Sequence, residues 1–234
     1  MIDLIVTPNL ITVPGIEPDF FSDEPASVAT TIQLLLVLTV LSLAPAILIM
    51  MTAFTRIVIV LSFVRQGLAT QSMPPNQVLI GLALFITFFI MAPVLSEVND
   101  RALTPFLNNE MTQDEALAEA AIPMKEFMAK HTREKDLALF MGYAGLDQPE
   151  SLDDIPLTSL IPAFAISELK TAFQIGFLIF VPFLVIDMIV ASVLMSMGMM
   201  MLPPVMIALP FKILLFVLVD GWYLIVESLL LSFR

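Results

Sequence analysis

The sequence predicts an all-α, membrane-associated fold in which two apolar helical hairpins flank one polar helical insert. Hydrophobic residues make up 59% of the 234 residues and charged residues only 14%, whereas an average soluble domain is roughly 45–50% apolar and about 25% charged. The apolar residues gather in long charge-free blocks, with proline and glycine near the ends of the blocks. Such blocks are typical of helices that lie in lipid or inside a large assembly.

Residues 1–30 form an acidic segment that we expect to lie outside the cytoplasm. The segment contains five acids and no lysine or arginine, so the basic start of an ordinary signal peptide is missing. We therefore expect a polar lead-in to the first apolar helix rather than a cleaved leader.

Residues 31–96 are predicted to form the first apolar hairpin. The block 31–51 is charge-free and long enough to cross hydrocarbon, which takes ~20 residues of helix. A second apolar run, 78–95, follows Pro74 and Pro75. Because proline is well tolerated in the first turn, this pair predicts the start of a helix.

Residues 97–170 form a polar insert, which we expect to be mainly helical. The insert contains fourteen acids and six bases. Between residues 114 and 128, apolar residues recur at spacings of three and four, the period of an amphipathic helix. Pro149, Pro156 and Pro162 predict irregular chain between this helix and the next apolar block.

Residues 171–234 are predicted to form the second apolar hairpin. The stretch is almost free of charge and is interrupted by Gly198 and by the pair Pro203 and Pro204. Glycine followed by two prolines ends one helix and begins another, so we expect two antiparallel helices with a tight loop.

The arginines predict how the chain crosses the membrane. Arg56 and Arg65 lie between the first two apolar runs, and short connections rich in lysine and arginine stay in the cytoplasm. We therefore expect this connection and the loop of the second hairpin to lie on the cytoplasmic side of the membrane. Residues 1–30, the polar insert and the C-terminus are then expected on the opposite side.

Asp187 and Lys212 each lie in an otherwise apolar stretch, where an unpaired charge costs several kcal/mol. Asp187 precedes Gly198 by eleven residues and Lys212 follows Pro204 by eight. In an antiparallel hairpin, the two side chains then stand about 16 Å and about 12 Å from the loop. We expect an intramembrane ion pair. It either fixes the register of the helices or acts as a switchable, proton-linked pair.

Four methionines surround Gly198 in the predicted loop: Met197, Met199, Met200 and Met201. Methionine is unbranched and polarizable, so it adapts to irregular space. Two interpretations remain open. The methionines fill an ordinary hairpin turn, or several copies around an axis form a deformable seal.

Asp220 raises the alternative of an intramembrane aspartyl protease, because it lies eight residues after Lys212 on about the same helical face. The glycine-rich context usual for such a catalytic aspartate is absent, and Gly221 and Trp222 follow instead. This pattern is more typical of a helix end, so we reject the protease.

No other class of site is predicted. A net charge of −12 argues against nucleic acid, whose phosphates require clustered cations. The chain has no cysteine, and its single histidine, His131, lies in a charged stretch, where we expect a solvated surface residue rather than a metal ligand. No phosphate-binding glycine loop is present. We expect no metal, no cofactor and no enzymatic activity.

Several long segments closely resemble the FliP family of flagellar type III export-gate proteins. They are FTRIVIVL at 54–61, PPNQVLIGLA at 74–83 and SELKTAFQIGF at 167–177, followed by Pro182, Asp187, the glycine-methionine run at 198–201, Pro203, Pro204, Lys212, Asp220, Gly221 and Trp222. The resemblance covers about residues 45–225 in matching order. Injectisome export-gate proteins share these blocks, although residues 171–174 and 211–222 look more flagellar.

The resemblance implies a multi-subunit helical channel in the bacterial inner membrane, at the flagellar basal body and partly on the periplasmic side. In that channel several copies of the chain assemble with FliQ and FliR, near FlhA and FlhB, and unfolded flagellar export substrates pass through it. The alternatives are the equivalent injectisome subunit and a proton-coupled transporter.

The resemblance also assigns roles to individual residues. Met199, Met200 and Met201 correspond to a gasket, and Asp187 and Lys212 to paired charges within apolar helices. The positions that correspond to hairpin and interface residues of the family are Pro74, Pro75, Glu168, Lys170, Gly198, Pro203, Pro204 and Asp220.

Overall fold

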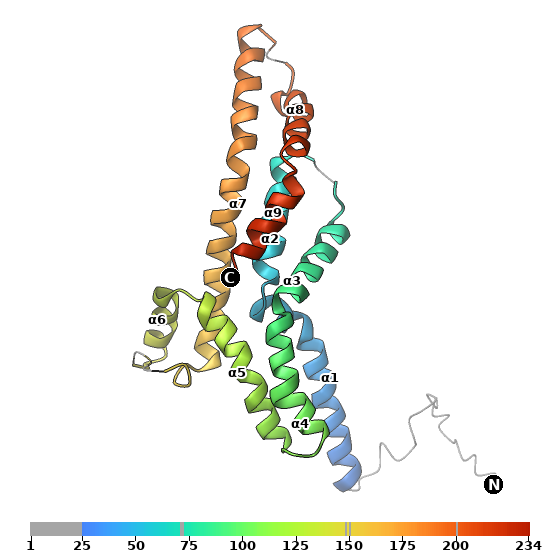
Figure 1. The fold of residues 1–234 in the computed structure, drawn as a ribbon, viewed down its shortest axis with the longest axis vertical. Coiled ribbons are helices and arrows are strands. Elements are labelled where there is room, and N and C mark those ends of the chain that lie inside the picture. The colour runs from blue at the N-terminus through green and yellow to red at the C-terminus, as the bar shows by residue number, and fades with distance from the viewer. Residues whose placement is uncertain (1–24, 71–72, 148, 150, 200) are drawn as a thin grey trace, which may run out of the picture. The chain divides into compact units, whose positions relative to one another are not determined.

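The computed structural model describes residues 25–70, 73–147, 149, 151–199 and 201–234. Its helices, labelled in Figure 1, are α1 (Pro25–Met51), α2 (Phe54–Gly67), α3 (Asn76–Val98), the π-helical turn η2 (Asn99–Leu103), α4 (Thr104–Leu107), α5 (Gln113–His131), α6 (Glu134–Tyr143), α7 (Leu157–Ser196), α8 (Pro204–Leu218) and α9 (Gly221–Leu231). None of these described residues lies in a β-strand. The all-α class predicted from the sequence is therefore confirmed.

The chain divides into two compact units, Met1–Ala46 and Ile47–Arg234. The described part of the first unit, residues 25–46, is the beginning of α1 and carries no charge. Inside this helix, the hydroxyl group of Thr39 donates a hydrogen bond to the carbonyl of Leu35 at 2.7 Å. A helix that is apolar all round and satisfies its hydroxyl internally suits lipid or the interior of an assembly.

The central feature of the second unit is the packing of α2 along α7 (Figure 1). The ring of Phe183 on α7 lies against Gly67 on α2, and the ring of Phe63 on α2 lies against Gly176 on α7. A Cβ atom on either glycine would lie 2.5 Å from a ring carbon. The two helices therefore approach closely only because both positions are glycine. We call these reciprocal contacts the Phe–Gly locks.

The helix α2 replaces the connection expected around Arg56 and Arg65. The chain breaks only at Thr52 and Ala53, and the next fourteen residues are helical. Arg56 is buried on this helix, so it is not a loop charge that reports on topology. The orientation predicted for this segment stays a prediction, now supported by Arg65 alone, because a buried ion pair, described below, removes Arg56 from the charges that contact water or headgroups.

The helix α3 begins directly after Pro75, as the proline pair predicts. With η2 and α4 it forms one continuous helical stretch, Asn76–Leu107. The amphipathic helix predicted between 114 and 128 is confirmed as α5. Its start is fixed by a reciprocal cap, in which the backbone N–H of Glu115 donates to the hydroxyl of Thr112 and the Glu115 carboxylate accepts from the Thr112 N–H. Such a capping box satisfies two N–H groups at the helix end.

The helix α7 has 40 residues and is therefore about 60 Å long, twice the ~30 Å thickness of a hydrocarbon core. It begins at Leu157, with Pro156 as its N-cap and Pro162 inside the helix. The irregular chain expected as far as Pro162 thus ends at Pro156. The helix continues without a break past position 170, so the polar and apolar stretches of sequence meet within one helix.

The second hairpin turns at Gly198. This glycine has φ +74°, and the N–H groups of Gly198 and Met199 donate to the carbonyls of Met195 and Leu194, which is the Schellman closure of a helix C-terminus. Pro203 is the N-cap of α8 and Pro204 its first residue, where the missing N–H of proline costs nothing.

Two described helical stretches, Asn76–Leu107 and Leu157–Ser196, are long and apolar enough to cross a membrane. Up to four spans result if each of two bent helix pairs counts as one span; the pair of α8 and α9 is bent by 63°. The chain is therefore membrane-associated, as its composition indicates.

Candidate functional site

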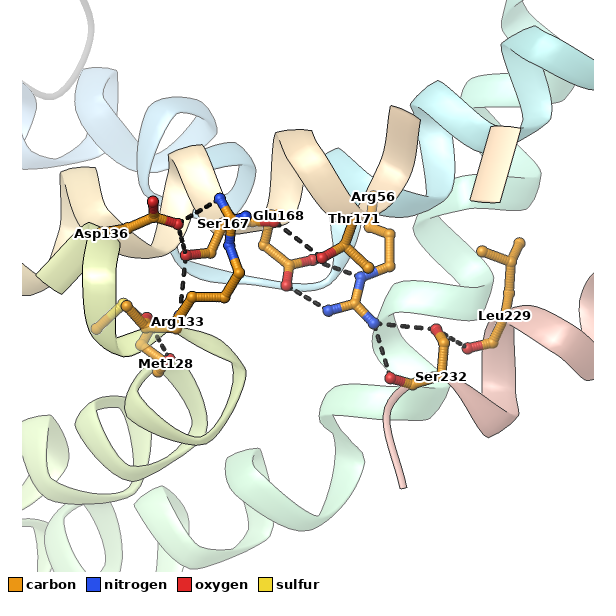
Figure 2. A network of polar contacts seen from close by, with 10 residues as sticks. Arg56, Met128, Arg133, Asp136, Ser167, Glu168, Thr171, Leu229 and Ser232 are labelled. Atoms are coloured by element: carbon orange, nitrogen blue, oxygen red, sulfur yellow. Dashed lines mark hydrogen bonds and ion pairs between the residues drawn. The ribbon is translucent and has the colours of Figure 1, made fainter. Parts of the chain in front are cut away.

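Arg56 on α2 and Glu168 on α7 form a buried ion pair, with side chains 3% and 0% exposed (Figure 2). Arg56 Nε donates to Glu168 Oε2 at 2.9 Å, and Arg56 Nη2 donates to Glu168 Oε1. Two parallel N–H···O bonds of this kind make the strongest arginine–carboxylate geometry. The pair joins the two helices that the Phe–Gly locks hold together.

The same guanidinium group binds the end of α9. Arg56 Nη1 donates to the carbonyl of Ser232 at 2.8 Å and to its hydroxyl oxygen at 3.0 Å. The guanidinium carbon lies 3.7 Å from the centre of the Phe233 ring, a cation–π contact. Among the described residues, neither Arg56 nor Glu168 has a buried nitrogen or oxygen without a partner. We call this set of contacts the Arg56 junction.

A second polar cluster connects α6 to α7 beside the Arg56 junction (Figure 2). The hydroxyl of Ser167 donates to Asp136 Oδ2 at 2.7 Å and accepts from the backbone N–H of Arg133 at 3.0 Å. The Arg133 guanidinium pairs with the same carboxylate oxygen. Burial would raise the pKa of Asp136, but the bonds from Ser167 and Arg133 outweigh it and hold the pKa below its usual value. The carboxylate therefore stays ionised.

His131 lies in an aromatic cluster instead of in solvent, so the expectation of a solvated residue is wrong. Its ring centre is 4.9 Å from that of Phe127 and 5.2 Å from that of Phe233. Burial, with the nearby positive charges of Arg56 and Lys130, lowers the pKa of His131 to about 4. Phe127, four residues earlier in the sequence, is the signal that could have placed this ring on a packed helical face.

The structure brings Asp187 and Lys212 together across the α7–α8 hairpin. Lys212 Nζ donates to Asp187 Oδ2 at 2.7 Å, and the side chains are 2% and 24% exposed. The second carboxylate oxygen, Asp187 Oδ1, is buried and has no hydrogen-bond partner among the described residues. The pair is therefore joined by a single hydrogen bond, and the acceptor Asp187 Oδ1 remains without a donor among the described residues.

An apolar groove of about 440 Å³ lies between α7 and α8, on the loop side of this pair. Its lining is aliphatic, methionine and phenylalanine side chains, with no charged residue; among them are Ile186, Val190, Leu194, Met197 and Phe211. The charge pair is thus separated from the methionine loop by apolar surface.

The methionine loop projects its described side chains outward. Met199 is 43% exposed and Met201 is 98% exposed, whereas Met200 lies outside the described residues. Exposed methionines at the end of a hairpin form an adaptable apolar surface.

The other residues singled out in the sequence are dispersed. Pro74 and Pro75 precede α3, Lys170 is exposed on α7, and Asp220 is exposed at the start of α9 with φ +50°. Because α8 ends before Asp220, this residue does not share a helical face with Lys212, and that expectation is wrong. No group of three or more metal-ligating side chains occurs among the described residues.

Sequence reasoning missed the pairing of Arg56 with Glu168. The sequence places Arg56 in the connection between two apolar runs and Glu168 in the polar insert, so it predicts no contact between them. The available signal was that Arg56 lies between apolar residues on both sides, where a charge is expected to have a partner, but nothing in the neighbouring sequence points to Glu168.

Comparison with known proteins adds the last observation. Residues 37–229 match the model of the FliP family. The chain is 75% identical to the flagellar biosynthetic protein FliP of Bacillus subtilis over 214 residues, which cover 92% of this chain and 97% of that protein. It is 52% identical to FliP of Pectobacterium carotovorum (94% and 86% covered) and 44% identical to FliP of Borreliella burgdorferi (97% and 92% covered). The chain belongs to the FliP family of flagellar biosynthetic proteins.

Proposed function

We propose that this chain is a structural, non-catalytic subunit of the flagellar type III export gate. Several copies assemble with FliQ and FliR, near FlhA and FlhB, into a helical channel in the bacterial inner membrane at the flagellar basal body. Unfolded flagellar proteins pass through this channel. The polar insert, residues 97–170, faces the periplasm, and the methionine loop faces the cytoplasm.

The observation that carries the proposal is the large apolar surface of a chain whose internal charges are already paired. Both apolar hairpins leave long side chains exposed, among them Phe85, Phe89, Phe177 and Met188. Lipid or neighbouring subunits must cover such a surface. Since the three relatives named above are flagellar proteins, the flagellar gate is favoured over the injectisome gate.

The first experiment is native mass spectrometry of the tagged chain, extracted in detergent after co-expression with its neighbouring genes. We expect one discrete complex that contains several copies of this chain with FliQ-like and FliR-like partners. A monomer or a simple dimer without such partners would overturn the proposal.

Within the proposed gate, Met199, Met200 and Met201 form the deformable gasket. The exposure of Met199 and Met201 supports this role, because methionine side chains adapt to whatever passes or packs against them. We expect the triple change to alanine to leave assembly intact and to let ions leak through the closed gate. An intact complex that does not leak in a liposome flux assay would contradict the gasket.

A proton-coupled transporter is the second candidate, and the unpartnered oxygen of Asp187 is the observation that favours it. An incompletely bonded carboxylate inside apolar helices can take up and release a proton. Proton flux that depends on Asp187, from a chain that purifies without partner subunits, would support the transporter over the gate.

A further inference from the structure

We propose that Arg133, Lys135 and Lys170 form a binding site for a phosphate group, which the headgroup of an anionic lipid supplies. The three cations come from two elements: Arg133 is the N-cap of α6, Lys135 is the second residue of that helix, and Lys170 is on α7. The site lies outside the methionine loop, the Asp187–Lys212 pair and the Arg56 junction.

Contacts between α6 and α7 bring the three cations to one place. Ser167 bonds both the backbone N–H of Arg133 and the carboxylate of Asp136, which fixes the start of α6 against α7. Lys170 follows Ser167 by three residues, so it lies on the same face of α7 one turn further along. Its ammonium group lies within interaction range of Arg133 and Lys135. The site is thus built on a rigid helix-to-helix connection.

The charges at this place are not balanced within the chain. Three cations meet two carboxylates: Asp136, which already binds Arg133 and Ser167, and Glu134, which is exposed at the start of α6. Arg133 Nε and Nη1 are buried and have no acceptor among the described residues. Converging cations favour the binding of an anion with several acceptor oxygens, and a phosphate group is such an anion.

The position of the site along α7 indicates where the anion comes from. Lys170 is the last charged residue before a stretch in which only Asp187 is charged, as far as the helix end at Ser196. Those 26 residues are about 39 Å long, which is enough to cross ~30 Å of hydrocarbon. Lys170 therefore stands where the helix leaves the apolar layer, at the depth of lipid phosphates. Basic residues at that depth bind anionic headgroups.

The test measures lipid binding by the full chain in its extracted assembly. The assembly is titrated with phosphatidylglycerol, and separately with zwitterionic phosphatidylcholine, and bound lipid is counted by native mass spectrometry. We expect a preference for phosphatidylglycerol. Replacing Lys170 with Gln should weaken phosphatidylglycerol binding about fivefold, and adding Lys135→Gln should weaken it about fivefold again, because each basic residue near a membrane surface contributes about 1 kcal/mol.

The matched control is Arg101→Gln, which removes an exposed cation of the same insert that pairs with Glu97. It should bind phosphatidylglycerol as the parent does. Both lysines are exposed, so the variants should keep the helicity of the parent by circular dichroism. Equal affinity of the parent for both lipids, or equal affinity of the parent and the double variant for phosphatidylglycerol, would overturn the proposal.

A competition arm separates the two sources of the phosphate group. Inorganic phosphate is added at constant ionic strength, with chloride as the reference. If lysine-dependent lipid binding resists phosphate, the site requires the headgroup with its chains. If phosphate displaces the lipid from the parent and has no effect on the residual binding of the double variant, the site accepts the free anion as well. Displacement that is equal in the parent and the double variant would contradict the site.

Discussion

The two ion pairs that α7 makes, with Arg56 and with Lys212, differ in how completely they are bonded. At the Arg56 junction, the guanidinium bonds both oxygens of Glu168, reaches Ser232 and stacks on Phe233. At the other pair, Lys212 makes one bond to Asp187 and leaves Asp187 Oδ1 buried without a partner among the described residues. Both oxygens of the Glu168 carboxylate thus accept hydrogen bonds within the chain, whereas only one oxygen of the Asp187 carboxylate does so among the described residues.

This difference in hydrogen bonding indicates different roles for the two pairs: one stabilises the fold of the single chain, and the other depends on solvent or neighbouring subunits. Removing one partner from a buried, saturated pair leaves an uncompensated charge in the core. A carboxylate with a free oxygen and 24% exposure has access to a proton, a water molecule or a neighbouring subunit. We therefore expect the Arg56 junction to hold the fold of the single chain, and the Asp187–Lys212 pair to matter most in the assembled complex.

The largest effect is expected for Arg56→Leu. This change leaves the carboxylate of Glu168 buried without a counter-ion and should lower the free energy of unfolding by about 3–5 kcal/mol. Thermal unfolding followed by circular dichroism in one detergent measures the difference. Arg101→Leu is the control, because its pair with Glu97 is exposed and should contribute about 0–1 kcal/mol. Equal losses for the two variants would mean that burial of the junction has no energetic consequence.

A smaller effect is expected for Lys212→Met. The remaining carboxylate of Asp187 can be protonated or hydrated, so the cost should be about 1–3 kcal/mol, the range for an unsatisfied buried group. The double change Asp187→Lys with Lys212→Asp should restore part of the complex lost in either single variant, as measured by gel filtration. Restored assembly without protein export would favour the proton-linked role over the register-fixing one.

The pH dependence of stability should further distinguish the Arg56 junction from the Asp187–Lys212 pair. His131, the single histidine of the sequence, contacts Phe233 of the Arg56 junction. The pKa of His131 is about 4 in the folded chain, below its ordinary value of 6.5. As the pH falls, the unfolded chain binds the proton first, so stability decreases from pH 6.5 to about 4 and does not change through this group above pH 6.5.

The matched variant for this prediction is His131→Gln. The difference in unfolding midpoint between the parent and the variant should narrow as the pH falls from 6.5 to 4, and it should stay constant from pH 7 to 8. We expect a smaller change than for Lys212→Met, because His131 is only partly buried. A difference that is independent of pH would show that the histidine is protonated equally in both states.

The smallest effect is expected for Ser232→Ala. This change removes the bond from Arg56 to the serine hydroxyl and the local bond from that hydroxyl to the carbonyl of Leu229, and it keeps the bond from Arg56 to the backbone carbonyl of Ser232. The part of the cost that belongs to the Arg56 bond should be about 0.5–1.5 kcal/mol, the net value of one hydrogen bond. Ser228→Ala, at an exposed position on α9, is the control and should have a smaller effect. Equal losses of stability for Ser232→Ala and Ser228→Ala would mean that the bond between Arg56 and the Ser232 hydroxyl does not stabilise the fold.

The sequence predicted the parts of the fold that depend on local pattern. The all-α class and the helix α5 follow from charge-free blocks and from period-3.6 spacing, and the start of α3 follows from Pro74 and Pro75. The contact of Asp187 with Lys212 follows from counting residues on either side of one loop. Each of these inferences needs only neighbouring sequence and the rise of a helix.

The sequence did not predict contacts between distant segments. Arg56 and Glu168 are 112 residues apart, and no local pattern distinguishes a buried arginine from one at a membrane boundary. The same limit applies to His131, whose burial depends on Phe233, about a hundred residues later. Such pairings depend on tertiary packing, which burial of apolar surface decides as a whole.

The Phe–Gly locks have a consequence for motion. For α2 to slide along α7, the rings of Phe183 and Phe63 must both leave their glycines in the same step. We therefore expect the two helices to move as one rigid unit. Spin labels on α2 and α7 should therefore keep a constant separation.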